Sequence, residues 1–292
     1  NISITAEFLT KSSSREENEN RSTMSILVQN TRAADKLAPK QLLVPIEKLA
    51  KKSERLFPAH LESTSARGIT TTIPRFLFTG PGDRSLFLRV GIFAGVHGDE
   101  TSGVHAALEL LRRLHENPEP ALGYELFVYP VCNPWGFGRN TRWLKSGADM
   151  NREFWRGSDE VEVRMLEGQL EHLAFDGIIA LHSDDTSEGV YGFVKGHELT
   201  RHVLEPSLEA ASRFLPRNFD RSIDNFESNN GIIEKGYAGI LGAPPSQKSK
   251  PFEIVFETPQ NADPNLQIES HITAATSILE NFRSMISQAQ NI

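Results

Sequence analysis

The residues best suited to bind a metal are His97 and Glu100, in the segment 96–101 (VHGDET). This segment follows an apolar run and precedes a helix-like stretch. A three-residue spacing and a tight turn at Gly98 let an imidazole and a carboxylate converge on one cation, and zinc accepts such nitrogen and oxygen ligands. The alternative is structural, because the helix dipole favours acidic residues at a helix N-terminus. The pair alone leaves both interpretations open.

A third candidate ligand is His182, which closes the apolar run 177–182. In parallel α/β sheets ligands collect at the carboxyl ends of the strands, so two such strand ends would bring His182 near His97 and Glu100. A single histidine at this position is more commonly a packed core residue. We interpret the other histidines as surface or packing residues: His60, His105, His115, His172, His197, His202 and His271.

The segment 133–157 reads as a long irregular loop that holds all three tryptophans of the chain. It also carries Arg139, Arg142, Arg152 and Arg156, a cationic patch in a chain of net charge −7. Guanidinium groups match the two oxygens of a carboxylate. The alternative is a loop held by its own tryptophans with solvated arginines. Loops of this length are more often functional than idle, so we favour a substrate-binding loop.

A candidate for proton transfer is Glu257, which ends the apolar run 252–257. A carboxylate at the mouth of a sheet and partly removed from water can have a raised pKa that suits a general base. The alternative is an acid at a strand end that faces water. The residue types alone do not decide between the two.

The elements that must position these residues alternate between strands and helices. We predict strands over 124–131, 177–182 and 252–257, and a hairpin of 69–79 with 85–96 around the turn signal at 80–83. We predict helices over 45–56, 101–115, 159–173, 198–215 (interrupted by Pro206) and 263–288. This alternation predicts an α/β fold with one domain, a mixed and mostly parallel twisted sheet and helices on both faces.

Composition limits the classes of protein. A polar tract over 11–21 predicts a flexible N-terminal tail at 1–35, with a catalytic domain over 36–292. The net charge of −7 argues against nucleic-acid or membrane partners, and no run approaches the ~20 apolar residues that span a bilayer. One cysteine, Cys132, cannot form an internal disulfide. We therefore expect a cytoplasmic protein, and its oligomeric state stays open.

Taken together, the motifs resemble those of the zinc carboxypeptidase superfamily, which includes murein-peptide amidases and a succinylglutamate desuccinylase/aspartoacylase branch. The family order is His-x-x-Glu, Asn-Pro-x-Gly (here 133–136), Arg, Asp-x-Asn-Arg (149–152), His-Ser and Glu. The resemblance implies a zinc carboxypeptidase-like fold and one Zn²⁺ per chain, bound by His97, Glu100 and His182.

The resemblance also implies roles for the remaining site residues. Glu257 would be the general base, and Arg142 would polarise the scissile carbonyl and stabilise the oxyanion, with Arg139 as the second candidate for that role. Asp149 would hold the imidazole of His97. Asn151 and Arg152 would bind the carboxylate of the substrate, and Tyr237 would also contact the substrate.

The substrate class stays open between a peptide and a small N-acyl amino acid. The first option is a metallocarboxypeptidase or peptide amidase, and the second is a deacylase of the desuccinylase/aspartoacylase type. The chain ends soon after Glu257, without the β-rich region that usually follows in the aspartoacylase-type branch, which favours the first option. Two departures from the family pattern affect substrate preference, Ala180 in place of an acid and Glu153 beside the carboxylate-binding pair. A non-catalytic metal- or peptide-binding relative is the alternative outside enzymes.

Overall fold

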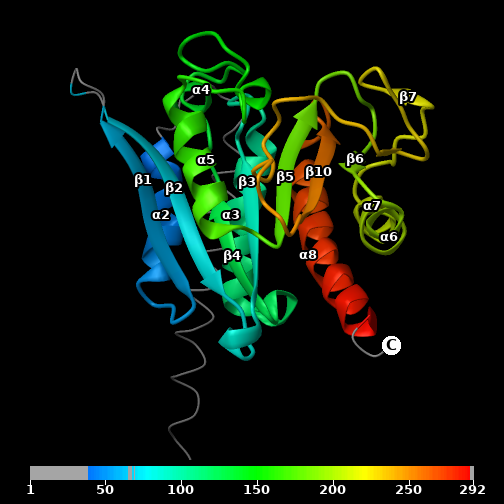
Figure 1. The fold of residues 1–292 in the computed structure, drawn as a ribbon, viewed down its shortest axis with the longest axis horizontal. Coiled ribbons are helices and arrows are strands. Elements are labelled where there is room, and N and C mark those ends of the chain that lie inside the picture. Colours follow the sequence, from blue (N-terminus) through cyan, green and yellow to red (C-terminus); the bar gives the residue numbers. More distant parts are fainter. Residues whose placement is uncertain (1–38, 65–67, 69, 290–292) are drawn as a thin grey trace, which may run out of the picture. The chain divides into compact units, whose positions relative to one another are not determined.

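The computed structural model describes residues 39–64, 68 and 70–289, and the predicted tail at 1–35 lies outside them. An eight-stranded sheet with the order β1-β2-β4-β3-β5-β10-β6-β9 forms the centre of the described chain (Figure 1). Its strands are β1 (Leu56–Thr64), β2 (Thr70–Thr79), β3 (Leu88–Ala94), β4 (Tyr124–Tyr129), β5 (Gly177–Asp184), β6 (Tyr191–Val194), β9 (Ile232–Ile233) and β10 (Phe252–Pro259).

The middle of the sheet is parallel and its outer parts are mixed. Strands β4, β3, β5 and β10 run parallel to one another, whereas β1 with β2, β2 with β4, and β10 with β6 are antiparallel. Strands β3 and β5 are buried on both faces, as a parallel strand covered by helices must be. The predicted α/β fold with a mostly parallel sheet is confirmed.

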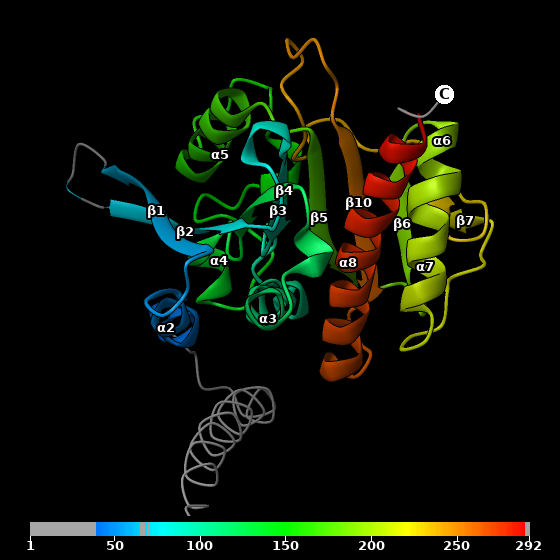
Figure 2. The ribbon, with the colours of Figure 1, turned by 90° about the horizontal axis from the view of Figure 1, so that it is seen from below.

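Helices cover both faces of the sheet (Figure 2). The helix α5 (Val161–Leu173) lies on one side and α3 (Thr101–Glu116) on the other. On the α3 side, α8 (Pro264–Ala289) packs against α3, against α7 (Glu205–Ala211) and on β10. Apolar residues at helical spacing in α3, such as Val104, Leu108 and Leu111, are fully buried, which fixes that helix on the sheet.

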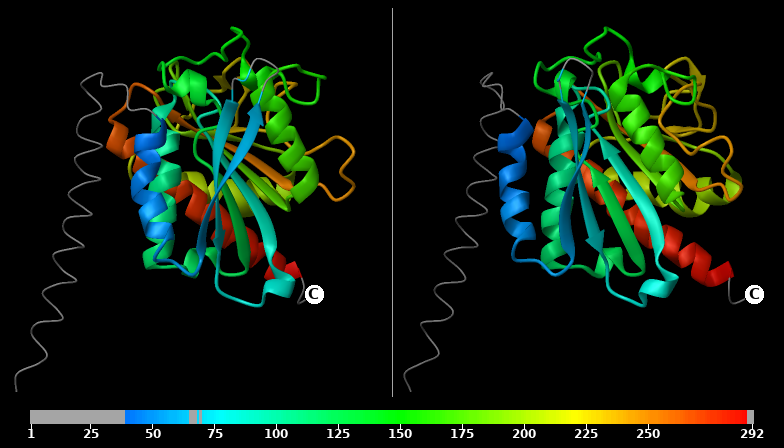
Figure 3. Two further views of the ribbon diagram at one scale, coloured as in Figure 1. Left: turned by 90° about the vertical axis from the view of Figure 1, so that its left-hand side faces the viewer. Right: turned by 60° about the vertical axis from the view of Figure 1, so that its left-hand side comes forward.

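The predicted hairpin of 69–79 with 85–96 is wrong. Strand β2 pairs with β1 and β4, and β3 pairs with β4 and β5, so β2 and β3 are not neighbours. The hairpin is formed by β1 and β2 instead, beside α2 (Figure 3). The turn signal at 80–83 ends β2, but the chain does not fold back along β2. The next strand, β3, is apolar on both faces and is therefore more stable in the centre of the sheet, between β4 and β5.

The predicted helix over 45–56 is displaced in the structure. Helix α2 runs from Pro39 to Ala50, with Pro45 inside it, and Leu56 begins β1. Proline is favoured in the first helical turn, so Pro45 looked like a start. The helical turn that precedes Pro45 is stable because Leu42 and Leu43 are buried together with Ile46.

The predicted helix over 198–215 is irregular, and the irregular turn lies directly before Glu205 and Pro206. It consists of α6 (His197–Leu199), a π-helical turn (Thr200–Leu204) and α7, which ends at Ala211. Pro206 directly follows the π-helical turn, and it has no amide proton to donate to the carbonyl groups of that turn, so the regular helical hydrogen bonds are interrupted there. Within the residues that the structure describes, no helix is long and apolar enough to cross a membrane.

A buried histidine in α3 predicts how stability depends on pH. His105 is 9% exposed, and burial lowers its pKa to about 4. A histidine with a lowered pKa in the folded state stabilises the fold fully above pH 6.5, and this contribution is lost as the pH falls toward 4. Between pH 7.5 and 5.0, the free energy of unfolding should fall by about 2 kcal/mol more in the wild type than in His105→Gln. Chemical denaturation at the two pH values measures this, with the exposed His60→Gln as control, and equal losses in all three proteins would contradict it.

Candidate functional site

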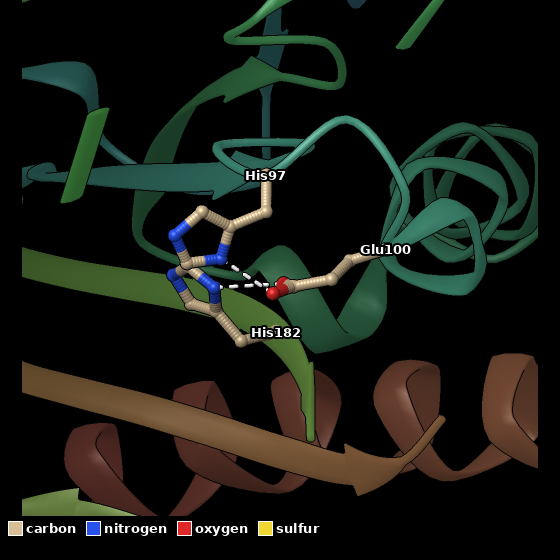
Figure 4. A group of neighbouring side chains, drawn as sticks. All are labelled: His97, Glu100 and His182. Carbon is tan, nitrogen blue, oxygen red and sulfur yellow. Dashed lines mark hydrogen bonds and ion pairs between the residues drawn. The ribbon is translucent and has the colours of Figure 1, made fainter. Parts of the chain in front are cut away.

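Three ligand atoms of His97, Glu100 and His182 lie within 4.8 Å of one another, and all three side chains are buried. His97 follows β3, Glu100 directly precedes α3, and His182 lies near the end of β5. Both imidazoles turn their Nδ1 atoms toward the carboxylate, with His182 Nδ1 at 2.8 Å from Glu100 Oε2 (Figure 4). The two nitrogens and the carboxylate are a donor set that fits zinc.

The turn that carries His97 depends on a close approach of two loops. A Cβ atom on Gly98 would lie 2.0 Å from the backbone of Gly136, in the short helix α4 (Pro134–Phe137), so only glycine fits there. Asn133 caps α4 by accepting a hydrogen bond from Gly136 N at 2.9 Å, and its amide donates to Trp143 O at 3.1 Å. The Asn-Pro-x-Gly motif therefore supports the metal-site turn from behind.

Asp149 connects the metal-site histidine to an arginine. Its Oδ1 lies 3.1 Å from His97 Nε2, and its Oδ2 accepts from Arg142 Nη2 at 2.9 Å. With the Nε2 proton directed to Asp149, the Nδ1 lone pair of His97 faces Glu100 and can bind a metal. Burial would lower the pKa of His97, but Glu100 and Asp149 outweigh it and raise that pKa to about 9. A site that binds a proton so strongly also favours another cation.

Glu257 lies beside the metal ligands because of strand register. On β10 it pairs with His182 of β5 and with Tyr191 of β6, so these side chains share one face of the sheet. Burial raises the pKa of Glu257 well above its ordinary value, and the carboxylates of Glu100, Asp184 and Asp224 raise it further. The direction is the one expected of a general base in a partly desolvated site.

A cavity of about 350 Å³ adjoins the three ligands. The predicted site residues that also line it are Arg142, Asn151, Arg152, Tyr237 and Glu257. Asp149 is not in the lining, since it lies behind His97. Arg139 is also absent from it, because its guanidinium stacks over the Trp135 ring at 4.3 Å. Glu153 is turned to Ser158, whose hydroxyl donates to it at 2.8 Å.

The predicted carboxylate-binding residues are already engaged with the loop that follows β9. Asn151 Oδ1 accepts from Leu241 N at 2.8 Å, which leaves the amide nitrogen of Asn151 free to donate. The Arg152 guanidinium lies 3.9 Å from the centre of the Tyr237 ring. The Tyr237 hydroxyl in turn donates to Asp224 Oδ1 at 2.9 Å.

Polar residues of the cavity that sequence reasoning missed include Asp184, Tyr191 and Asp224. Tyr191 donates to Asp184 Oδ2 at 2.9 Å. Asp224 stands at the tip of a small hairpin of β7 (Ser222–Ile223) and β8 (Phe226–Glu227). Asp224 and Asn225 both have positive φ angles, as a tight hairpin turn requires, so the Asp-Asn pair was the one signal available.

Known proteins are similar to this chain. A model of the succinylglutamate desuccinylase/aspartoacylase catalytic domain matches residues 87–219. A structure from Shewanella amazonensis SB2B, described as a candidate metallopeptidase, has a TM-score of 0.69 at 21% identity, over 82% of this chain and 91% of that one. No curated protein shows a significant match.

Two further structures extend the likeness of fold to carboxypeptidases. A metallo-carboxypeptidase from Burkholderia cenocepacia has a TM-score of 0.63 at 15% identity, over 84% of this chain and 68% of that one. Carboxypeptidase A from Helicoverpa armigera has a TM-score of 0.66 at 14% identity, over 94% and 82%. In this chain, the three candidate ligands lie near the ends of β3 and β5 of this fold.

The convergent donor set predicts a metal content. The wild-type chain, loaded with zinc and dialysed, should retain about one ion per chain, because three protein ligands converge. His182→Ala should lose most of it, whereas the exposed His172→Ala should not. Elemental analysis measures the stoichiometry. Full retention of zinc by His182→Ala would rule out this site.

Proposed function

We propose that the chain is a member of the zinc carboxypeptidase-like superfamily and a zinc-dependent hydrolase that cleaves an amide bond next to a carboxylate group, a proposal that the family match and the shared fold support. The observation that carries the proposal is one cavity lined by a metal-binding trio, a carboxylate with a raised pKa and an arginine suited to a substrate carboxylate. These are the groups that hydrolysis of an acidic amide requires.

The chemistry divides among the residues of the cavity. Bound by His97, Glu100 and His182, zinc would supply a Lewis acid that lowers the pKa of water to about 7. Glu257 would take the proton from the attacking water and return it to the leaving nitrogen. Arg142 would donate to the developing oxyanion, since Asp149 holds its Nε and Nη2 while its Nη1 lies 3.6 Å from Glu100.

The charges of the cavity support a substrate with a single carboxylate. Within the described residues, Arg142 and Arg152 are the basic side chains other than histidine that line it, and Arg142 is paired with Asp149. Four aspartates also contribute to the lining: Asp99, Asp184, Asp185 and Asp224. Succinylglutamate would bring several carboxylates against these acids, so we favour a peptide substrate whose terminal carboxylate binds Arg152.

Strand register supports an apolar side chain on the residue that bears this carboxylate. His182, Glu257 and Tyr191 lie side by side on one face of the sheet. Two residues along each of these strands, the same face carries Ala180, Val255 and Phe193. A second cavity of about 50 Å³ adjoins the first along Phe193, Gly236, Ile240 and Val255. Its size fits a few carbon atoms, which favours a small aliphatic side chain.

One observation favours the alternative of a deacylase. The matching family model over residues 87–219 is that of desuccinylases and aspartoacylases. Assays of the zinc-loaded protein should therefore compare peptides with N-acyl amino acids of one and of two carboxylates. Faster cleavage of the dicarboxylate compounds would select the deacylase.

Substitution of the proposed base separates turnover from binding. Glu257→Gln should lower kcat by at least about 10²-fold, because the amide keeps the shape but cannot accept a proton. Zinc content and KM should change little. Steady-state kinetics and elemental analysis measure both, with Glu62→Gln on the exposed edge of β1 as control. Substantial turnover by Glu257→Gln would return Glu257 to a structural role.

The two arginines of the cavity should differ in their kinetic effects. Arg152→Ala should mainly raise KM, since it removes a contact that ground state and transition state share, whereas Arg142→Ala should mainly lower kcat. Arg139→Ala, in the same loop but outside the cavity, is the matched control. Amidating the substrate carboxylate should add little to the loss in Arg152→Ala but should add fully in Arg142→Ala. Full additivity in both variants would contradict this division.

A further inference from the structure

Five buried polar side chains form a connected group where β5 and β10 meet the helices α3 and α8, and one of them, Ser183, also borders the cavity. They are contributed by α3, β5, β10 and α8, and each is at most 5% exposed: Ser102, Ser183, Thr258, Gln267 and His271. Buried polar groups are costly unless they are hydrogen-bonded, and apolar residues could fill the same space. Their presence behind the site therefore calls for a physical reason.

The group is joined to the site through two strands. Ser183 directly follows the candidate ligand His182, and Thr258 directly follows Glu257. In the β5–β10 register Ser183 pairs with Thr258 as His182 pairs with Glu257. Successive side chains of a strand point to opposite faces, so the two hydroxyls meet beneath the two site residues.

Hydrogen bonds connect the two hydroxyls to the helices on that face. Ser183 Oγ lies 3.0 Å from Thr258 Oγ1 and 2.9 Å from Ser102 Oγ in the first turn of α3. Thr258 Oγ1 also lies 3.1 Å from His271 Nε2 of α8. Two helices and two strands are thus connected by hydrogen bonds at one point.

The two residues of α8 set the direction of these bonds. Gln267 donates both amide protons to the backbone oxygens of Gln260 and Ala262, at 3.1 and 2.9 Å, so its Oε1 faces the hydroxyls and accepts from them. Burial lowers the pKa of His271 to about 3, so the ring is neutral and carries one proton. Placing that proton on Nε2 lets His271 donate to Thr258, whose own proton goes on to Gln267.

The group also reaches the ligand carboxylate. The backbone N–H of Ser183 donates to Glu100 Oε2 at 3.1 Å. Ser102 lies two residues after Glu100, in the helix that Glu100 precedes. The hydroxyl pair between Ser102 and Ser183 therefore holds the start of α3 against the end of β5, with Glu100 between them.

We propose that Ser102, Ser183, Thr258, Gln267 and His271 are positioning residues that fix Glu100, His182 and Glu257 relative to one another, with His271 as the donor that anchors the group to α8. The proposal deepens the proposed function and rests on it for the activity assay alone. Partners of this kind behind a metal site typically change metal affinity or activity by roughly 10–100-fold when they are removed.

The test uses pairs of variants that differ in one hydrogen-bonding group. Thr258→Val removes the hydroxyl and keeps the shape, whereas Thr258→Ser keeps the hydroxyl. His271→Leu removes the donor, whereas His271→Gln places an amide nitrogen near the position of Nε2. Thr79→Val, at a buried threonine of β2 outside the group, controls for the loss of a buried hydroxyl.

Two readouts separate positioning from folding. The absorption spectrum of the cobalt-loaded protein reports the geometry of the ligands, and steady-state kinetics separate kcat from KM. We expect Thr258→Val and His271→Leu to shift the cobalt bands and to lower kcat roughly 10–100-fold, with little change in KM. Thr258→Ser, His271→Gln and Thr79→Val should resemble the wild type in both.

Each contrary result has a definite meaning. Wild-type spectra and kcat in both Thr258→Val and His271→Leu would overturn the proposal, as would an equal loss in Thr79→Val. A loss in His271→Gln as large as in His271→Leu would overturn the donor role of His271. If the wild type binds cobalt but hydrolyses none of the substrates, the proposed function fails while the spectra still decide the positioning role. If it binds no cobalt, both fail.

Discussion

The rest of the site depends on one buried negative charge, the carboxylate of Glu100. At 3% exposure this group has lost its contact with water, which costs several kcal/mol for an ion unless positive charge compensates it. Burial alone would raise its pKa, but His97 and His182 outweigh burial and hold that pKa well below its ordinary range. Two imidazoles and a carboxylate that stay in this arrangement form a place where a divalent cation replaces protons at little structural cost.

The charged groups around Glu100 alternate in sign, and they shift the pKa values of the two glutamates of the site in opposite directions: that of Glu100 is lowered and that of Glu257 is raised. Asp149 stabilises His97 and Arg142, and Arg142 lies near Glu100. Glu257 stands on the same face of the sheet, where burial and the nearby carboxylates raise its pKa and outweigh the opposite effect of Arg142. When the environments of two carboxyl groups shift their pKa values in opposite directions, the group with the lowered pKa is suited to hold a cation and the group with the raised pKa is suited to exchange protons. The order of the strands, more than any single residue, creates this difference.

The parts of this arrangement that are local in sequence could be predicted, and those set by long-range pairing could not. Buried runs at β3, β5 and β10 read correctly as strands, and their ends placed His97, His182 and Glu257 at one edge. The pairing of β1 with β2, by contrast, depends on which strands become central, and no turn signal encodes that. The Ser183–Thr258 pair could not be predicted for the same reason, because it depends on the register between β5 and β10, which are far apart in the chain.

Under the proposed function, the surroundings of Arg152 would let the cavity be stable without substrate and still select a carboxylate. Its guanidinium is covered by the Tyr237 ring, and Tyr237 is held by Asp224 at the tip of the β7–β8 hairpin. A cation–π contact at a partly exposed site contributes only about 0.5–1 kcal/mol, whereas a carboxylate offers two charge-assisted hydrogen bonds to the same group. A neutral ligand would lose the contact with Tyr237 without gaining those bonds. The loss of the contact with Tyr237 would therefore cost both ligands the same, and the two charge-assisted hydrogen bonds would provide the selectivity of Arg152 for a carboxylate.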